Sequence, residues 1–446
     1  MKIAVYAIAR DEQQFVRRFC ESAKDADLIL IADTGSSDNT VELAKECGAT
    51  VYSISVRPWR FDKARDTALN LIPGDFDVCI SLDLDEVLEP GWREEIERVW
   101  TAETTRLRYK FDWGCGISFY YEKIHHRTGY YWHHPCHEWP RIDPRMAEVW
   151  AHTDMLLVSH HPDPTKSRGQ YMDLLDVAVK EDPQCPRNGF YQARELTFHY
   201  RWEEAIVALK RYLELPGATW ENERCYAMRL LGKSYEELGD WDQALKWYRL
   251  AVAECSWTRE PWVDLAMATY RRSMWTESYS AAMSALRITD KQAVYTMDPS
   301  VWTEKPYDLA SIAAWNLGMK EDGIRHTLDA FRCDPSDQRI KNNVAMMYKN
   351  MRKTDVCAII PSKSNIDGLL KVVDLLKNEK SVAKIIIVAD GDEAYETICK
   401  EIPYPHINNI SIWAYEYTHT PYFKEIFKYI KTLENAYVEL NKLFNK

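Results

Sequence analysis

Ile80-Ser-Leu-Asp-Leu-Asp-Glu86 is an apolar run that ends abruptly in acidic residues. The run 76–82 is short, rich in β-forming residues and preceded by the turn Pro73-Gly74-Asp75, so it predicts a buried strand. Ligands of open α/β sheets bind beyond the carboxyl ends of the strands. Asp83 and Asp85 leave this strand close together, where they can share a divalent cation such as Mg²⁺ or Mn²⁺. A solvated acidic loop before a helix fits the same residues.

The composition indicates a globular protein with several domains. The chain has 446 residues, of which 46% are hydrophobic, and a formal net charge of −11. No apolar run approaches the roughly 20 residues that span a bilayer, and residues 1–9 lack a cleavage-site pattern, so they predict a first strand. The 11 cysteines contain no Cys-x-x-Cys pair, which favours reduced thiols and a cytoplasmic location. The negative charge disfavours general nucleic-acid binding.

The first part of the chain alternates strand and helix patterns. Strands are expected at 3–9, 28–32, 50–54 and 76–82, and helices at 13–24, 38–47 and 63–71. This alternation predicts a mostly parallel α/β sheet, in which the loops after Ala9, Ala32 and Leu82 meet at one edge. The polar residues of these loops include Arg10, Glu12, Asp33, Ser36, Asp38, Asp83, Asp85 and Glu86. Carboxylates gathered in this way need a cation or hydrogen-bond donors, because unpaired carboxylates repel one another.

Four motifs carry a family resemblance. They are Ala7-Ile-Ala-Arg-Asp-Glu12, Ile29-Leu-Ile-Ala-Asp-Thr-Gly-Ser-Ser-Asp-Asn-Thr40, Phe61-Asp-Lys-Ala-Arg-Asp66 and Ser81-Leu-Asp-Leu-Asp-Glu86. In this order, at predicted strand ends and a helix start, they resemble successive motifs of family 2 glycosyltransferases, which have the Rossmann-like GT-A fold. The resemblance implies a nucleoside-diphosphate-sugar donor, most often a UDP-sugar, and Mn²⁺ or Mg²⁺ as cofactor.

The resemblance also implies roles for individual residues. The nucleotide pocket would be formed by Ala9, Arg10, Glu12, Asp33, Gly35, Arg65, Asp83 and Leu84. Asp33 would bond to the base, and Arg65 would face the diphosphate, although Arg65 also fits an ordinary surface salt bridge. Asp83 would contact the ribose or a metal-bound water, and Asp85 would bind the metal. The chain departs from the family at Asp66, where asparagine is usual, which puts a contact by Asp66 in doubt.

Histidine and aromatic residues are concentrated between 125 and 161, where most of the 12 histidines lie. Three explanations stay open. A zinc site would require regular Cys/His spacing, but Cys115 and Cys136 are isolated. A platform of rings that stack on a sugar has the candidates Trp113, Tyr130, Tyr131, Trp132 and Trp139. The third explanation is that Tyr130-Tyr-Trp-His-His-Pro-Cys-His-Glu-Trp139 resembles the segment that closes the acceptor side of the family's site.

On that resemblance, His137 and Glu138 lie near the transferred sugar and act with Asp85. An inverting transfer needs a base for the acceptor hydroxyl, and Glu138 is the first candidate. The alternatives are Asp143 and Asp154. The metal would stabilise the departing diphosphate. Val158-Ser-His-His161 resembles the family's next motif, in which His160 would complete the shell of the metal or diphosphate. Each histidine also fits a purely structural role.

From about Ser167 the pattern changes to helices with small residues at tetratricopeptide spacing. The clearest copy contains Gly232, Tyr235, Gly239, Ala244, Tyr248 and Ala251, and other copies contain Ala193, Ala205, Ala266, Ala285, Ala314, Gly318, Gly323, Ala330 and Pro335. A generic helical bundle is the alternative. Stacked repeats form a concave face that typically binds a peptide or protein. The array would therefore position a polypeptide acceptor or a partner, or join two protomers into a homodimer.

After Asn350 the α/β pattern returns. Strands are expected at 356–360 and 384–389, and helices at 367–377 and 422–444. Ile359-Ile-Pro-Ser362 and Ile387-Val-Ala-Asp-Gly-Asp392 resemble the first two motifs of a second transferase domain, but no arginine helix or acidic loop follows them. The sequence therefore predicts three parts, a GT-A domain at 1–165, helical repeats at 166–350 and a partial α/β segment at 351–446.

These patterns favour a metal-dependent, inverting glycosyltransferase of the hexosyltransferase type that is followed by tetratricopeptide repeats. One alternative is a non-catalytic scaffold whose repeats bind a partner and whose transferase domain is degenerate. A nucleotidyltransferase would carry a glycine-rich phosphate loop after its first strand, where this chain has Arg10-Asp-Glu12. Neither the sugar nor the acceptor can be read from the sequence.

Overall fold

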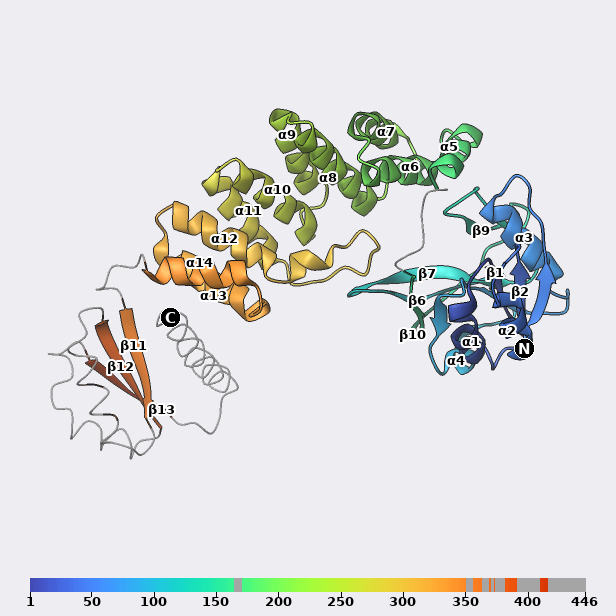
Figure 1. Ribbon diagram of the computed structural model, residues 1–446, viewed down its shortest axis with the longest axis horizontal. Coiled ribbons are helices and arrows are strands. Elements are labelled where there is room, and N and C mark those ends of the chain that lie inside the picture. The colour runs from blue at the N-terminus through green and yellow to red at the C-terminus, as the bar shows by residue number, and fades with distance from the viewer. Residues whose placement is uncertain are drawn as a thin grey trace. The chain divides into compact units, whose positions relative to one another are not determined.

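The computed structural model describes residues 1–163, 171–349, 356–362, 382–390 and 410–415, together with Leu369 and Val373. The chain divides into two compact units, Met1–Ala313 and Ala314–Lys446, whose elements are labelled in Figure 1. Every helix in the described part of the chain is too short or too polar to cross a lipid bilayer. The predicted boundaries at 165 and 350 stay a prediction.

An eight-stranded sheet forms the centre of the N-terminal domain, with the order β3-β2-β1-β4-β7-β6-β10-β5. Its strands are β1 (Ile3–Ala9), β2 (Leu28–Asp33), β3 (Thr50–Ser53), β4 (Val78–Ser81), β5 (Glu86–Leu88), β6 (Arg106–Gly114), β7 (Ile117–His126) and β10 (Trp150–His160). From β3 to β4 the strands are parallel, which confirms the expected Rossmann-like α/β fold. Beyond β4 the sheet is mixed, because β7 is antiparallel to both β4 and β6.

Both faces of the sheet are covered, which explains the continuous apolar runs of its parallel strands. The helices of this domain are α1 (Gln13–Ser22), α2 (Thr40–Glu46), α3 (Phe61–Leu71) and α4 (Trp92–Val99). Along β1, Ile3 and Val5 pack in one cluster with α1, whereas Ala4 and Tyr6 pack in another cluster with α3, since successive side chains of a strand point to opposite faces. The loops after β1, β2 and β4 leave the same edge of the sheet.

A separate hairpin is formed by β8 (Tyr130–His133) and β9 (Trp139–Ile142). His133 pairs with Trp139, so residues 134–138 form the connecting loop. Two residues of this loop, His134 and His137, have φ values of 80° and 51°. Side chains with a Cβ rarely adopt such positive φ values, so contacts outside the loop must hold its conformation.

The rest of the first unit is a series of paired helices. They are α5 (Tyr171–Glu181), α6 (Pro186–Phe198), α7 (Trp202–Glu214), α8 (Glu221–Glu237), α9 (Trp241–Glu254), α10 (Arg259–Arg271), α11 (Trp275–Arg287), the 3-10 helix η1 (Pro299–Trp302) and α12 (Lys305–Asn316). A Cβ at Gly232 of α8 would lie 2.7 Å from the Tyr248 ring of α9, so glycine lets these two helices approach closely. Gly239 has φ +79° in the turn between them. The small residues expected of a tetratricopeptide pair are confirmed here.

The second unit contains the helices α13 (Lys320–Cys333) and α14 (Gln338–Lys349) and the strands β11 (Val356–Ser362), β12 (Val382–Asp390) and β13 (Ile410–Tyr415). The three strands form a parallel sheet in that order. The expected strands at 356–360 and 384–389 are confirmed, whereas β13 is not among the expected strands. The helices expected at 367–377 and 422–444 lie outside the described residues, apart from Leu369 and Val373.

Candidate functional site

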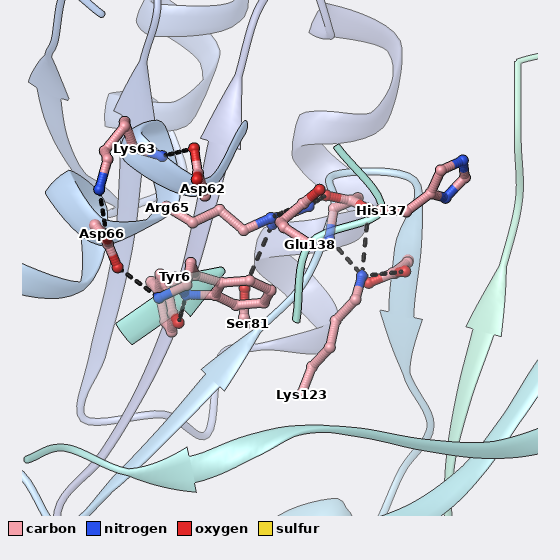
Figure 2. A network of polar contacts seen from close by, with 12 residues as sticks. Tyr6, Asp62, Lys63, Arg65, Asp66, Ser81, Lys123, His137 and Glu138 are labelled. Atoms are coloured by element: carbon pink, nitrogen blue, oxygen red, sulfur yellow. Dashed lines mark hydrogen bonds and ion pairs between the residues drawn. The ribbon is translucent and has the colours of Figure 1, made fainter. Parts of the chain in front are cut away.

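The Arg65 side chain joins distant segments of the chain at the carboxyl edge of the sheet (Figure 2). Its Nε donates to Glu138 Oε1 at 2.5 Å, and its Nη2 donates to Asp83 Oδ1 at 2.6 Å. Its Nη1 donates to the hydroxyl of Ser81 at 3.4 Å, and the guanidinium lies 4.9 Å from the centre of the Trp132 ring. The side chain is only 5% exposed, so the alternative of a surface salt bridge is wrong. One cation orients two carboxylates.

A second cation, Lys123 on β7, reaches the same group of carboxylates. Its Nζ lies 3.4 Å from Asp83 Oδ2 and 3.2 Å from Glu86 Oε1. Burial would lower the pKa of Lys123, but the two carboxylates raise it well above its ordinary value. Burial also opposes ionisation of Asp83, yet Arg65 and Lys123 hold the pKa of that carboxyl well below its usual range. Asp83 is therefore an anion held between two cations.

Asp85 faces His160 at the end of β10. Asp85 Oδ2 lies 3.4 Å from His160 Nε2, and the Asp85 carbonyl accepts the backbone N–H of His161 at 2.8 Å. The His160 ring lies 4.3 Å from the Trp113 ring between centroids, and its buried Nδ1 has no hydrogen-bond partner among the described residues. Burial would lower the pKa of His160, but the Asp85 carboxylate outweighs burial and raises that pKa.

The carboxylate of Asp85 and the imidazole of His160 are suitable ligands for a small divalent cation whose other ligands come from a substrate. Mg²⁺ is usually bound through one or two carboxylates, with substrate phosphates and water completing its shell. Over the residues that the structure describes, no group of three or more His, Cys, Asp or Glu side chains is arranged to hold a metal ion. A closed zinc site, which needs four protein ligands, is therefore not formed in the described part of the chain.

Hydrogen bonds to the carboxylate of Asp33 hold the conformation of the loop after β2. This carboxylate accepts the backbone N–H of Gly35 at 3.1 Å and the backbone N–H and hydroxyl of Ser36 at 3.2 and 2.5 Å. Gly35 has φ +108° and open space around its Cα, so a side chain at this position would strain the backbone. Asp33, which was expected to bond to the base, and Gly35 thus determine the shape of this loop.

The loops after β1 and β2 are tied together. The Ala9 carbonyl accepts the backbone N–H and the hydroxyl of Thr34 at 2.9 and 3.0 Å, and Asp11 accepts the backbone N–H of Ser37 at 2.7 Å. Arg10 lies between these contacts with a side chain that is 69% exposed. Its guanidinium is therefore largely in solvent beside the paired loops, with Nε 4.0 Å from Asp11 Oδ2.

Two other residues expected in the nucleotide pocket have buried side chains. Leu84 is 2% exposed and packs in the cluster that contains α1, so only its backbone is able to face a nucleotide. Glu12 is 9% exposed, and its backbone N–H donates to the hydroxyl of Thr40 at 2.8 Å. The side chains of Leu84 and Glu12 therefore support the loops from inside and contribute little to the surface of the nucleotide pocket.

A buried chain of hydrogen bonds runs behind the guanidinium. Asp66 Oδ1 accepts the backbone N–H of Trp132 at 2.6 Å, and the Trp132 Nε1–H donates to the Tyr6 hydroxyl at 2.9 Å. Tyr6 Oη lies 2.9 Å from His125 Nε2, and His125 Nδ1 lies 2.8 Å from the next residue's carbonyl. The proton of the imidazole is thus on Nδ1, and Nε2 accepts from Tyr6. Asp66 has a structural role: it holds the strand that carries Trp132.

Glu138 and His137 point to opposite sides of the loop 134–138 (Figure 2). Glu138 reaches Arg65. The His137 ring instead stacks on Tyr191 of α6, with the ring centres 3.9 Å apart and the planes 11° apart. Glu138 thus belongs to the cluster of charged side chains around Arg65, whereas the His137 ring packs on the helical array.

The remaining candidates have other partners. Among the aromatic candidates, Tyr130 and Trp132 are buried, so neither is able to stack on a sugar. Trp113, Tyr131 and Trp139 are exposed. The alternative bases bond elsewhere: Asp143 pairs with Arg145 at 2.5 Å, and Asp154 accepts the hydroxyl of Tyr120 at 2.6 Å.

Lys123 is the main residue of the cluster that the sequence did not single out. It reaches Asp83 because β7 is the neighbour of β4, where Ile80 pairs with Ile124. The sequence does not reveal which strand lies beside β4. The one available signal is a lone lysine in a strand rich in aromatic residues.

Residues 5–110 match the sequence profile of Glycosyl transferase family 2. This part of the chain is a family 2 glycosyltransferase domain. The matched stretch includes Arg65, Asp83 and Asp85, whereas Glu138 and His160 lie beyond it. The four motifs of the sequence therefore belong to the family 2 domain. Later segments supply the other residues of the cluster: β7 and β10 of the sheet carry Lys123 and His160, and the loop of the β8–β9 hairpin carries Glu138.

Curated relatives match parts of the chain. An uncharacterized glycosyltransferase of Rickettsia prowazekii is 30% identical over 103 residues, which are 23% of this chain and 34% of the relative. Its counterpart in Rickettsia typhi is 29% identical over the same shares. The chain thus spans about a third of the length of these relatives. A TPR repeat-containing protein of Synechococcus elongatus is 32% identical over 96 residues, which are 21% of this chain and 23% of the relative.

Solved structures are similar to segments of this chain at low identity. The APC/C hetero-tetramer Cut9–Hcn1 has a TM-score of 0.33 and 16% identity, with 41% of this chain and 34% of that chain covered. YrrB, described as a TPR protein with an unusual peptide-binding site, has a TM-score of 0.32 and 13% identity, with 39% and 82% covered.

Proposed function

We propose that the protein transfers a sugar from a nucleoside-diphosphate-sugar donor to an acceptor hydroxyl, with inversion at the anomeric carbon. The observation that carries this proposal is the contact of Arg65 with both Asp83 and Glu138 at the carboxyl edge of a family 2 domain. That edge is where open α/β sheets bind ligands. A transferase domain that had lost its activity would not need to keep a buried cation between two carboxylates from distant segments.

The donor nucleotide is proposed to lie on the paired loops after β1 and β2. The backbone of Ala9, the Asp33 loop and the turn at Gly35 form this surface, and the exposed guanidinium of Arg10 suits an anionic ligand. Asp83 is positioned for the ribose by its bonds to Arg65 and Lys123. The resemblance of the chain to family 2 glycosyltransferases favours a UDP-sugar as the donor.

A divalent cation, Mn²⁺ or Mg²⁺, is proposed to be held by Asp85 and His160. Carboxylates outnumber the lysine and arginine cations in the site. The cations Arg65 and Lys123 pair with Asp83, Glu86 and Glu138, and Asp85 is a fourth carboxylate, which faces His160. When bound, the metal supplies Lewis-acid stabilisation of the departing diphosphate. Asp83 contacts Arg65 and Lys123 rather than presenting free oxygens, so we assign it to the ribose.

Glu138 is proposed as the general base. Arg65 donates to Glu138 Oε1, so the guanidinium fixes the position of the carboxylate. Oε2 is then assigned to accept the proton of the acceptor hydroxyl as that oxygen bonds to the anomeric carbon. The bond from the anomeric carbon to the diphosphate breaks in the same step, and the negative charge leaves with the nucleoside diphosphate.

The test compares carboxylate variants of the full chain. UDP release is measured from UDP-glucose, UDP-galactose and UDP-N-acetylglucosamine with Mn²⁺. We expect Asp85→Ala to abolish metal-dependent turnover and Glu138→Gln to lower kcat by about 100-fold or more, as removal of a general base does. Asp154→Ala is the matched control, since this exposed carboxylate pairs with Tyr120 away from the cluster. Unchanged turnover in Asp85→Ala would remove the proposal and favour a scaffold whose helical array binds a peptide or protein partner.

A further inference from the structure

The loop 134–138, which carries Glu138, is held from the helical array. Arg187 of α6 donates from its Nε to the carbonyl of His137 at 2.9 Å. Tyr191, one turn further along α6, stacks on the His137 ring at 3.9 Å and 11°. Residues four apart on a helix lie on the same face, so one face of α6 contacts both the backbone and the side chain of the residue before Glu138.

The start of the same loop is also embedded in the array. The side-chain nitrogen of Asn188 lies 3.2 Å from His134 Nδ1, and Asn188 is buried. Cys136 is 1% exposed and packs in the hydrophobic cluster that α6, α7 and α8 form. The loop is therefore inserted in the array by His134, Cys136 and His137, and Glu138 is the point at which it returns to the transferase domain.

The face of α6 that holds His137 is itself supported by Tyr295, from the segment after α11, and by the start of α8. Behind Tyr191 lies Tyr295, with ring centres 6.4 Å apart and planes 19° apart. The Tyr295 ring lies 5.4 Å from the Trp220 ring between centroids, with the planes tilted by 52°, and its hydroxyl donates to Glu223 of α8. His137, Tyr191, Tyr295 and Trp220 form a continuous row of rings that crosses from the hairpin loop to the N-terminus of α8.

The backbone of the loop requires such support. His134 and His137 both have positive φ values, which cost energy for side chains with a Cβ and persist only where the surroundings determine them. His137 and Glu138 point to opposite sides of the chain (Figure 2). A rotation of the loop at His137 would therefore move the Glu138 carboxylate away from Arg65.

We propose that Arg187 and Tyr191 are positioning residues for Glu138, so that the first helix pair of the array is a working part of the transferase site. The inference rests on the proposed role of Glu138. Catalytic groups need placement to within about half an ångström, and α6 is the rigid element that supplies it for this loop. The helical array has this role whether or not it also binds a partner.

The first test is amide hydrogen exchange in the full chain, which needs no substrate. Tyr191→Ala and Arg187→Ala are expected to speed exchange of the peptide that covers 133–139 at least tenfold, with β1 unchanged. Tyr191→Phe keeps the stacked ring and is expected to stay within twofold of wild type. Tyr248→Ala is the matched control, because it removes another buried tyrosine, 4% exposed against 8% for Tyr191, from the second helix pair, away from the loop. No acceleration in Tyr191→Ala, or an equal one in Tyr248→Ala, would overturn the inference.

A kinetic test separates positioning of Glu138 from general stabilisation. With UDP-glucose as the probe, kcat for UDP release is expected to fall at least tenfold in Tyr191→Ala and Arg187→Ala, while the donor KM stays within twofold and Tyr191→Phe restores kcat. A raised KM with unchanged kcat would contradict a role in placing the base. If the wild type releases no UDP from any donor, the proposed function fails, and the exchange measurement still decides whether α6 holds the loop.

Discussion

Asp66 follows Arg65 on α3 but bonds to a different partner. Its Oδ1 accepts the backbone N–H of Trp132, and burial raises the pKa of its carboxyl. An asparagine at this position, which is usual in the family the chain resembles, accepts the same hydrogen bond through its amide oxygen without a buried charge. We expect Asp66→Asn to be at least as stable as wild type at pH 7 by thermal unfolding.

Asp66→Ala is the contrasting variant, since it leaves the Trp132 N–H without its partner. An unpaired buried donor costs about 1–3 kcal/mol, and we expect a loss of that size in the free energy of unfolding. Equal stability of the alanine and asparagine variants would show that the hydrogen bond to Trp132 is not what Asp66 contributes.

His125 makes stability depend on pH. Burial lowers its pKa to about 3, below the value of about 6.5 in an unfolded chain. Between these values the unfolded state binds more protons, so stability rises with pH and is lost as the pH falls below about 6.5. A protonated Nε2 would also face the hydroxyl hydrogen that Tyr6 now donates to it.

The measurement is thermal unfolding from pH 8 to pH 4.5 in wild type and in His125→Gln, whose amide oxygen still accepts from Tyr6. We expect the variant to lose less stability, by about 1.4 kcal/mol for each pH unit below 6. Parallel pH profiles for the two proteins would contradict a buried neutral imidazole at this position.

Among the elements, the pair α8 and α9 gives the sharpest prediction. Gly232→Ala would place a Cβ 2.7 Å from the Tyr248 ring, and overpacking of this kind costs about 1–3 kcal/mol. Alanine gains about 1 kcal/mol of helix propensity over glycine, so the net loss expected in the free energy of unfolding is about 1 kcal/mol. Gly232→Ala with Tyr248→Leu is expected to lose less than the sum of the two single variants, since the smaller side chain makes room.

The elements also show what the sequence was able to predict. The motifs after β1, β2 and β4 and at the start of α3 were located correctly, because each lies in a local strand or helix pattern. Lys123 and the contact between Glu138 and Arg65 were not foreseen, since they depend on β7 being next to β4 and on the path of the β8–β9 hairpin. Such pairings join residues far apart in the sequence, and local periodicity does not encode them.

At the scale of the whole molecule, the sequence separates a transferase domain from a helical array, whereas the structure joins the two. His137 stacks on Tyr191, and Cys136 lies in the core of the array. The sequence placed His137 near the substrate on family resemblance alone. It gave no indication that this side chain packs on α6. The array was predicted to have a binding role, and the structure adds a supporting role for the loop of Glu138.

The measurement that tests the central claim most directly is thermal unfolding with Mn²⁺ and a panel of nucleoside diphosphates, in wild type and in Asp85→Ala. A ligand at about 100 times its dissociation constant stabilises the folded state by about 2.7 kcal/mol. We expect one nucleotide, UDP first, to raise the unfolding temperature of the wild type in the presence of Mn²⁺, and we expect Asp85→Ala to lose the part of the shift that depends on the metal. The absence of any shift in the wild type with every nucleotide at millimolar concentration would contradict a donor site at this edge of the sheet.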